Sequence, residues 1–368
     1  MRETRRVRYA VVGLGNIAQV AVLPAFAHAR KNSELAALIS SDSEKLAVLA
    51  KRYRVAVTGS YDDLERIIAE HAIDAVYVAV PNSLHREFTE RAARAGAHVL
   101  CEKPMAMNEA DCDAMIRAAA ENDVKLMIAY RLHFERANVR AVERIAEGRI
   151  GEPRIFSSVF SHQVKPGNIR TKREAGGGAL FDLGIYCLNA ARYLFRDEPT
   201  DVYAEQVFGT DERSEQVDEA TTAVLRFPGN RIAQFTASQG ASDVSEFRVV
   251  GTKGNVELDP AFDYVEELEE TLTVGDRKKR RTESKGDQFA PEILHFSKCI
   301  LEDLEPEPSG WQGLADVRIL NALVASAESG RRVEVTPIAM PDRPRKGITN
   351  KKPPVGRVRT VNAPSPSR

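Results

Sequence analysis

Short apolar runs alternate with amphipathic stretches along the first 130 residues of the chain. The apolar runs end in turn residues, as buried parallel strands do. They predict strands at residues 7–12, 34–39, 73–80, 97–101 and 124–129. The stretches between them predict one helix that ends at residue 28 and others at residues 45–54, 62–70, 84–95 and 109–122. This order of elements indicates an α/β domain with a doubly wound parallel sheet at residues 1–130.

The pattern changes after residue 130. A helix predicted at residues 135–147 is followed by segments in which apolar and polar residues alternate, or which are rich in β-formers. They predict strands at residues 154–164, 201–209, 220–228, 231–238, 246–250 and 255–258, with a hairpin turn at 227–230. A last helix is expected at residues 314–327. We predict a second domain at residues 131–340, an α+β substrate and oligomerisation domain with a large, open and mostly antiparallel sheet.

Two polar segments fall outside this pattern. Residues 341–368 are rich in Pro, Lys and Arg and have almost no apolar periodicity. Such a segment cannot offset its ordering entropy by burial, so we expect a mobile tail or a strap on a neighbouring subunit. The basic run at residues 277–281 lies in another polar stretch and is expected to be a solvated loop.

Composition excludes several classes of partner. The chain has 52 basic and 53 acidic residues and a net charge of -1, which argues against nucleic acid or an anionic membrane as partner. The arginines near the start precede an apolar run too short for a signal peptide or a membrane span, so we expect a cytoplasmic protein. The cysteines show no CxxC spacing and are expected to be reduced core residues, with no metal site. They are Cys101, Cys112, Cys187 and Cys299.

A glycine turn, Gly-Leu-Gly-Asn-Ile-Ala at residues 13–18, joins the first strand to the first helix. Gly13 allows the tight turn, Gly15 lets the backbone approach a pyrophosphate, and the small Ala18 permits close helix packing. Between a strand and a helix at the start of a βαβ pattern, this turn predicts a Rossmann dinucleotide-binding domain.

The end of the second strand predicts which dinucleotide is bound. Domains that bind NAD place an acidic side chain there, on the ribose 2′-hydroxyl. Here Ser40 and Ser41 follow the strand, Lys45 lies one turn into the helix, and Asp42 comes two positions late. A 2′-phosphate could accept hydrogen bonds from both serines and pair with Lys45. We therefore predict NADP rather than NAD.

Two further motifs lie where later strands end, and ligands of doubly wound sheets bind at these carboxyl ends. Pro81-Asn82 follows the third predicted strand, and His85 opens the next helix, where we expect it to cap the helix or to lie near the nicotinamide. Glu102-Lys103-Pro104 follows the fourth strand. Taken alone, this position of Lys103 is equally consistent with a functional lysine and with an ordinary surface lysine.

The second domain carries three consecutive glycines at residues 176–178, followed by helical periodicity. Glycines cost helix stability, and three together indicate close approach to another group. Asp182, Tyr186 and Asn189 have the i, i+4, i+7 spacing of one helix face, so we expect that face to look into a cleft.

These motifs, in this order, resemble the glucose-fructose oxidoreductase, inositol dehydrogenase and rhizopine-catabolism family, abbreviated Gfo/Idh/MocA. The resemblance covers about residues 7–338. Tyr130-Arg131, His133, residues 182–189 and Arg192-Tyr193-Leu194 look most like its glucose-fructose oxidoreductase branch and the related NADP-dependent aldose dehydrogenases. Inositol dehydrogenases generally have histidine where this chain has Tyr186. The resemblance implies a Rossmann domain, a substrate domain and hydride transfer at a sugar carbon.

The resemblance also implies the roles of the site residues. Lys103 matches the lysine of the family's Glu-Lys-Pro motif, and Asp182 and Tyr186 match its aspartate and acid/base position. Tyr186 is expected to be the acid/base, because a neighbouring ammonium such as Lys103 favours the phenolate form of a phenol. Asp182 would bind a hydroxyl or orient Lys103. The expected cofactor contacts are Gly13, Gly15, Asn16, Ile17, Ser40, Ser41, Lys45, Pro81, Asn82, His85, Glu102, Lys103 and Arg131. The expected substrate contacts are His133, Arg170, Lys172 and Arg173.

Three functions remain open on the sequence. The first is an NADP-dependent sugar dehydrogenase or reductase that releases its cofactor in each cycle. The second is a glucose-fructose oxidoreductase-like enzyme that keeps NADP and passes hydride from one sugar to another. The third is a non-catalytic dinucleotide-binding sensor, against which Lys103, Asp182 and Tyr186 argue. The open face of a large sheet predicts a homodimer or homotetramer.

Overall fold

The computed structural model describes residues 5–209, 211, 214–338, 344 and 347–367. Contacts between residues divide the chain into two compact units. Unit 1 comprises Met1–Arg131, Gly286–Leu314 and Asn350–Ser365, and unit 2 comprises Leu132–Lys285, Ala315–Thr349 and Pro366–Arg368. The chain thus leaves unit 1 after Arg131 and returns to it twice. Of the predicted tail, residues 341–343, 345, 346 and 368 lie outside the described residues.

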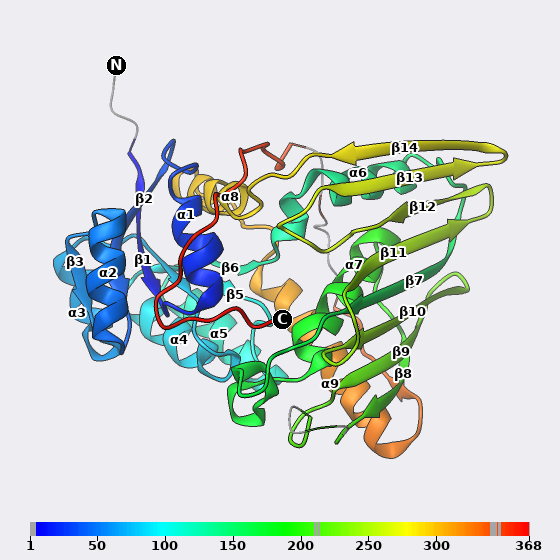
Figure 1. The fold of residues 1–368 in the computed structure, drawn as a ribbon, viewed down its shortest axis with the longest axis horizontal. Helices are drawn as coiled ribbons and strands as arrows, with labels where there is room; N and C mark the ends of the chain where they lie inside the picture. Colours follow the sequence, from blue (N-terminus) through cyan, green and yellow to red (C-terminus); the bar gives the residue numbers. More distant parts are fainter. Residues whose placement is uncertain (1–4, 210, 212–213, 339–343, 345–346, 368) are drawn as a thin grey trace. The chain divides into compact units, whose positions relative to one another are not determined.

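Unit 1 contains a six-stranded sheet with the order β3-β2-β1-β4-β5-β6, and all of its pairs are parallel (Figure 1). The strands are β1 Val7–Val12, β2 Ser33–Ile39, β3 Val57–Gly59, β4 Ala75–Val78, β5 His98–Glu102 and β6 Leu126–Ala129. The order reverses between β1 and β4, the switch point where doubly wound sheets bind their ligands. The predicted fold class is confirmed for this unit. The three-residue strand β3 was not predicted.

Capping residues mark the ends of two helices of unit 1. They are α1 Leu23–Ala25 after the π-helix η1 Ala18–Val22, then α2 Ser43–Tyr53, α3 Leu64–Glu70, α4 His85–Arg94, α5 Glu109–Glu121 and α8 Phe289–Leu301. The Asn108 side chain caps α5, and Arg54 ends α2 in the left-handed conformation at φ 57°. Helix α8, which is not among the predicted elements, packs against β1 and β2.

Unit 2 contains a nine-stranded sheet with the order β14-β13-β12-β11-β7-β10-β9-β8-β15 (Figure 1). The strands are β7 Pro153–Ser161, β8 Asp201–Val207, β9 Ala220–Phe227, β10 Arg231–Ser238, β11 Val244–Gly251, β12 Gly254–Leu258, β13 Leu268–Val274, β14 Arg277–Glu283 and β15 Val333–Glu334. Only β7 and β10 pair in parallel among these described strands, so the predicted mostly antiparallel sheet is confirmed. The longer helices are α6 Arg136–Ala146, α7 Ile185–Phe195 and α9 Gly310–Ser329, of which residues 310–314 belong to unit 1.

The basic run at residues 277–281 was predicted as a loop, and this prediction is wrong. The run forms edge strand β14, which pairs with β13 from Arg277 opposite Val274 to Glu283 opposite Leu268. Residues 277–282 are all exposed, so the apolar alternation that identifies a half-buried strand is absent. Lysines and arginines are common on edge strands because they oppose pairing with another chain.

Two exposed apolar side chains lie side by side on the open face of this sheet. Ile155 on β7 is 47% exposed and faces its register partner Ile232 on β10, which is 49% exposed. Such a surface is typical of contact between subunits. A homodimer or homotetramer remains a prediction.

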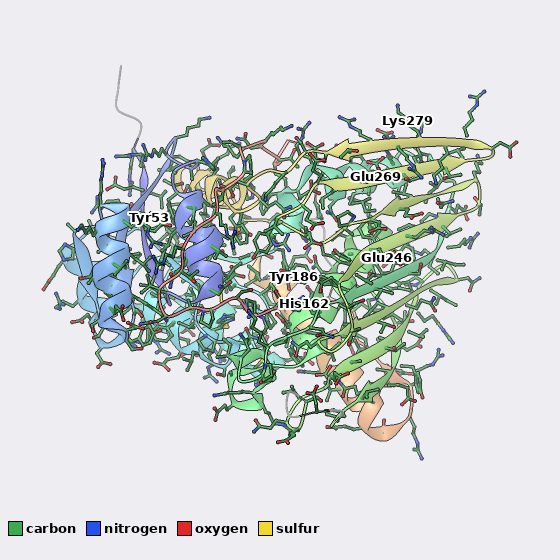
Figure 2. The ribbon with its side chains drawn as sticks, viewed as in Figure 1. Tyr53, His162, Tyr186, Glu246, Glu269 and Lys279 are labelled. Atoms are coloured by element: carbon green, nitrogen blue, oxygen red, sulfur yellow. The ribbon has the colours of Figure 1, made fainter. Side chains whose placement is uncertain are left out.

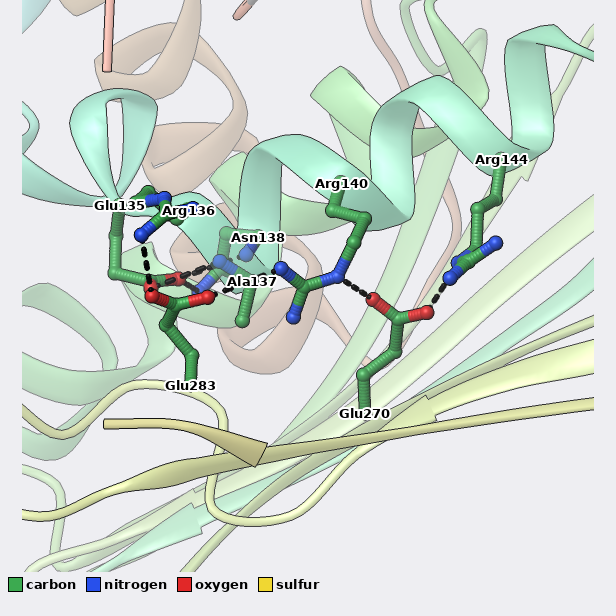
Figure 3. Close-up of polar contacts among 8 residues, drawn as sticks. All are labelled: Glu135, Arg136, Ala137, Asn138, Arg140, Arg144, Glu270 and Glu283. Atoms are coloured by element: carbon green, nitrogen blue, oxygen red, sulfur yellow. Dashed lines mark hydrogen bonds and ion pairs between the residues drawn. The ribbon is translucent and has the colours of Figure 1, made fainter. Parts of the chain in front are cut away.

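An ion-pair network joins α6 to β13 and β14 within unit 2 (Figure 3). Arg140 and Arg144 both bind the carboxylate of Glu270, whose side chain is 1% exposed. The Glu283 carboxylate lies 2.9 Å from Arg136 Nη1 and 3.1 Å from Arg140 Nη1. These charges are compensated by one another, so removal of one partner leaves a buried charge without its counterion.

Residues 350–365 of the predicted tail belong to the chain's own unit 1, and residues 366 and 367 belong to unit 2. Figure 1 shows the C-terminal segment, in red, running across the helical segment that follows β1. The sequence instead predicted a mobile tail or a strap on a neighbouring subunit. No helix among the described residues is long and apolar enough to cross a membrane.

Candidate functional site

The glycine turn after β1 has the shape that a dinucleotide requires. Gly13 has φ 90°, and a Cβ atom there would lie 2.5 Å from the Ala79 carbonyl oxygen, so glycine alone fits. A Cβ at Gly15 would have no atom within 4 Å, so there is space against the backbone at this position. The helix that begins with Asn16 and Ile17 directs its N-terminal N–H groups toward the turn. These residues fit the pyrophosphate of a dinucleotide.

At the end of β2, the side chains fit the predicted NADP contacts. Asp42 caps helix α2, because its Oδ1 accepts a hydrogen bond of 3.0 Å from the Lys45 backbone N–H. The Lys45 backbone N–H lowers the pKa of Asp42 and keeps it ionised on the helix N-terminus. The Oγ atom of Ser40 accepts a 3.2 Å bond from the Asp42 backbone N–H, and Ser41 follows Ser40. Asp42, the acidic residue within 40–43, therefore caps helix α2.

A buried acidic cluster lies under the carboxyl ends of β4, β5 and β6. The Tyr77 hydroxyl donates to Glu102 Oε1 at 2.8 Å and lies 3.4 Å from Glu292 Oε1 on α8. Arg131 donates to the side chain of Gln288 and is 5% exposed. Burial raises the pKa of Glu102, and burial together with the Glu102 charge raises the pKa of Glu292 well above its usual range. The hydrogen bond from Tyr77 therefore holds Glu102, the residue before Lys103, in place.

Sequence reasoning missed Tyr77 and Glu292. An acidic residue in the otherwise apolar run of α8 was the available signal for Glu292. Because buried carboxyls need partners, such a residue indicates a buried polar cluster.

His85 contacts backbone carbonyls through both of its ring nitrogens. Its ring is completely buried, with Nδ1 2.8 Å from the Pro104 carbonyl oxygen and Nε2 3.1 Å from that of Val80. Burial lowers the pKa of His85. The ring therefore links the turn after β4 to the turn after β5. This placement favours a positioning role over direct contact with the cofactor. Pro81 and Asn82, which are half-buried, begin the 3₁₀ helix Asn82–Leu84 beside it.

The glycines at residues 176–178 allow close packing at the start of the helix that carries Asp182 and Tyr186. A Cβ atom at Gly177 would lie 2.2 Å from the Arg170 carbonyl oxygen. Gly178 has φ 118°, and its Cβ would lie 2.3 Å from Asp218 Oδ1. The predicted close approach is confirmed, and the approaching group is another segment of unit 2.

Asp218 holds the beginning of this helix and was also missed by sequence reasoning. Its Oδ2 accepts 2.8 Å and 2.7 Å hydrogen bonds from Leu180 N–H and the Thr221 hydroxyl, and its carbonyl accepts one from Ala179. Burial raises the pKa of Asp218 to about 6. Its distance of 38 residues from Leu180 explains why no local sequence signal found it.

We expect Asp218→Asn to change the pH dependence of stability. The folded pKa of about 6 lies above the roughly 3.9 of an unfolded aspartate. Between these values the folded state holds more protons, so wild-type stability falls as pH rises. Asparagine does not titrate, so the stability of the variant relative to wild type should rise by about 2 kcal/mol from about pH 4 to about pH 6. Urea unfolding across this interval measures the difference, with the exposed Asp243→Asn as control. A pH-independent difference for Asp218→Asn would show that this carboxyl titrates alike in both states.

Asp182 is held by two polar side chains of unit 2. It lies on the π-helix η7 Leu180–Gly184, and its Oδ2 is 2.9 Å from Arg170 Nε and 3.4 Å from Gln239 Nε2. Asp182 and Arg170, predicted separately for catalysis and substrate binding, therefore form an ion pair. An arginine on one oxygen leaves the carboxylate oriented and able to accept further hydrogen bonds.

Tyr186, in the first turn of α7, lies against an aromatic cluster. Its ring packs edge-on against Phe160 with centroids 5.5 Å apart and lies 6.1 Å from Phe262. The ring of His162, which follows β7, also packs edge-on against Phe160 at 6.1 Å (Figure 2). Tyr186 and His162 are half-buried, and the cluster fixes the position of the phenol ring.

The other predicted residues of unit 2 lie elsewhere. His133 is 1% exposed, and its Nε2 is 2.8 Å from Asn189 Oδ1 in the core, which favours a structural role over substrate contact. Arg173 is exposed and donates to the Gln216 carbonyl at 3.0 Å, and Lys172 is exposed. Asn189 does not share a cleft-facing surface with Tyr186 as predicted. It is 4% exposed, and its Nδ2 donates to Asp316 Oδ2 at 2.8 Å, so it lies in the core of unit 2.

The four cysteines are free and buried. Among the residues that the structure describes, no group of three or more His, Cys, Asp or Glu side chains could hold a metal ion.

Comparison with known proteins gives consistent matches over both units. Residues 7–130 match the model of an oxidoreductase family with an NAD-binding Rossmann fold, and residues 138–257 match the GFO/IDH/MocA C-terminal domain. The chain is 34% identical to D-xylose 1-dehydrogenase [NADP(+)] of Haloarcula marismortui, over 89% of this chain and 93% of that protein.

Two solved structures are also similar. The aldose-aldose oxidoreductase of Caulobacter crescentus, complexed with glycerol, is 39% identical with a TM-score of 0.86, over 90% of this chain and 100% of that chain. KijD10, a 3-ketoreductase from Actinomadura kijaniata in complex with NADP and TDP-benzene, is 26% identical with a TM-score of 0.80, over 88% of this chain and 98% of that chain.

Proposed function

Because the chain belongs to the Gfo/Idh/MocA oxidoreductase family, we propose that it is an NADP-dependent enzyme that transfers hydride between the nicotinamide and a sugar. The sugar is an aldose or a related polyol or keto sugar. The observation that carries this proposal is similarity over about nine-tenths of the chain to two enzymes named for aldose substrates, at 39% and 34% identity.

The cofactor half of the site is supported by the geometry of unit 1. The glycine turn with its space at Gly15 would hold the pyrophosphate, and Ser40, Ser41 and Lys45 would hold the 2′-phosphate. When bound, NADP supplies the nicotinamide ring that accepts or returns hydride. His85 and the cluster under Glu102 would position the strand ends that face it.

The acid/base chemistry is assigned to three side chains. In oxidation, Tyr186 takes the proton of a sugar hydroxyl while hydride leaves the same carbon for the nicotinamide. A Lys103 ammonium beside the phenol would favour the phenolate of Tyr186 and so let it act as a base near neutral pH. Asp182, oriented by Arg170, accepts a hydrogen bond from a sugar hydroxyl. In reduction the steps reverse, and Tyr186 donates the proton.

A second candidate differs in the fate of the cofactor. A glucose-fructose oxidoreductase-like enzyme would keep NADP and couple oxidation of one sugar to reduction of another. The similarity to an aldose-aldose oxidoreductase supports this version. A non-catalytic sensor is disfavoured, because Lys103, Asp182 and Tyr186 are all present.

A steady-state assay tests the proposal. The protein is mixed with NADP⁺ or NAD⁺ and a panel of aldoses, including D-xylose, and reduced nicotinamide is followed by absorbance. We expect turnover with at least one aldose and a higher kcat/KM for NADP⁺ than for NAD⁺, because no free carboxylate is available to select against a 2′-phosphate. Tighter binding and faster turnover with NAD⁺ would contradict the assigned cofactor, and no sugar-dependent reduction would contradict the substrate class.

A further inference from the structure

Residues 359–364 of the tail form a strap across the glycine turn of unit 1 (Figure 1). The strap is anchored by Gln19, which is completely buried in η1. Gln19 Nε2 donates to the Val361 carbonyl at 2.8 Å, and its Oε1 accepts from the Val361 N–H at 2.8 Å. The same Nε2 also donates to the Leu14 carbonyl at 2.9 Å. One buried amide therefore binds both the glycine turn and the strap.

The strap makes further contacts toward both ends of the cofactor site. Asn16 Nδ2 donates to the carbonyls of Ala363 and Pro364 at 3.1 Å and 3.2 Å. On the other side, Asn362 Nδ2 donates to Asp42 Oδ2 at 3.2 Å and to Glu44 Oε2 at 3.0 Å. Asn16 belongs to the turn expected at the pyrophosphate, and Asp42 and Glu44 begin the helix beside the expected 2′-phosphate.

The strap leaves the backbone of the glycine turn available. Its hydrogen bonds to the turn use the side chains of Asn16 and Gln19, and within the described part of the chain none joins residues 359–364 to a backbone N–H of residues 13–17. The space against Gly15 is open with the strap in place. The strap therefore reaches from the glycine turn to the start of α2 and leaves the space beside the Gly15 Cα open.

Asn362 binds the start of helix α2 beside the expected 2′-phosphate position. Its backbone is left-handed at φ 46°, a conformation that asparagine tolerates better than most residues. The amide donates to the two carboxylates that begin α2, Asp42 and Glu44. The strap thus fixes the orientation of both carboxylates beside the expected 2′-phosphate position.

We propose that residues 359–364 complete the adenosine side of the NADP site and hold NADP between turnovers. The inference rests on the proposed function, since it takes NADP as the ligand. Asn362 and the Val361 backbone are then positioning groups, which act through Asp42, Glu44 and Gln19. A cofactor held in this way is reduced by one sugar and reoxidised by a second without leaving the protein.

The test compares two strap variants with a matched control. Val361→Pro removes the backbone N–H that donates to Gln19 Oε1. Asn362→Gly removes the side-chain amide that donates to Asp42 and Glu44, and glycine still permits the left-handed backbone. Val355→Pro introduces the same residue in the same tail, where the described residues give the Val355 N–H no hydrogen bond. Each full-length protein is loaded with NADP⁺ and diluted, and the release rate of NADP⁺ is measured. Trypsin cleavage of the tail, with and without NADP⁺, gives a second readout independent of turnover.

We expect Val361→Pro and Asn362→Gly to release NADP⁺ about tenfold faster than wild type, because each loses one or two hydrogen bonds of the strap. Val355→Pro should match wild type. NADP⁺ should slow tail cleavage in wild type and not in Val361→Pro. Equal release rates in all four proteins would overturn the strap proposal and leave the proposed function standing. Tighter NADP⁺ binding in the strap variants would do the same, because it would show that the strap competes with the cofactor. If wild type binds no NADP, the proposed function fails and the strap proposal fails with it.

Discussion

Tyr186→Phe is expected to lower kcat by about 10²–10⁴-fold while NADP binding is retained, because a positioned acid/base contributes about that factor. Phenylalanine keeps the ring that packs against Phe160 and Phe262 and loses the hydroxyl alone. The loss should therefore appear in turnover, with little change in stability. Lys103→Ala should also lower turnover and leave the glycine turn intact.

Tyr193→Phe is the matched control for this variant. Tyr193 lies on the same helix α7 and is 2% exposed, and its hydroxyl donates to Asn138 Oδ1 at 2.8 Å in the core. Loss of that hydrogen bond should cost about 1 kcal/mol of stability and leave kcat near wild type. Initial rates and an NADP⁺ titration on each variant separate the two effects. Near-wild-type turnover in both Tyr186→Phe and Lys103→Ala would end the assigned mechanism.

The second large effect is on stability. Glu270→Ala should lower the free energy of unfolding by about 3–5 kcal/mol, because Arg140 and Arg144 lose the carboxylate that compensates their charge (Figure 3). The side chains of Arg140 and Arg144 are 11% and 15% exposed, so water cannot replace the carboxylate fully.

The neighbouring residue supplies the control for Glu270→Ala. Glu269 lies next to it on β13 (Figure 2), is 42% exposed in its side chain and lies 3.7 Å from the exposed Arg280. Exposed pairs contribute about 0–1 kcal/mol, so Glu269→Ala should stay within that range. Urea unfolding of the two variants gives the comparison. If Glu270→Ala fell in the same range as Glu269→Ala, the network would add nothing to the stability of unit 2.

Local patterns were sufficient for most of the fold. The apolar runs at β1, β2, β4, β5 and β6 are long enough to be recognised, and the glycine turn after β1 lies where its spacing predicts. Strand β3 has three residues and no apolar run, and β14 is polar on both faces. Neither has the periodicity on which recognition of a strand depends.

Contacts between distant segments could not be predicted in this way. Tyr77 and Glu292 meet across 215 residues of sequence, and Gln19 and Val361 across 342. Asp218 shapes the helix of Asp182 from another loop. In each case the residue is ordinary in its local sequence, and only tertiary packing gives it a role.

The central claim is that a bound NADP is reduced by a sugar whose proton goes to Tyr186. The most direct measurement is a single-turnover experiment, in which protein loaded with NADP⁺ and freed of excess cofactor is mixed with an aldose while absorbance of reduced nicotinamide is followed. We expect reduction approaching one equivalent per loaded chain, slowed at least 100-fold in Tyr186→Phe. Loaded protein that no aldose reduces, or equal rates in wild type and Tyr186→Phe, would contradict the account.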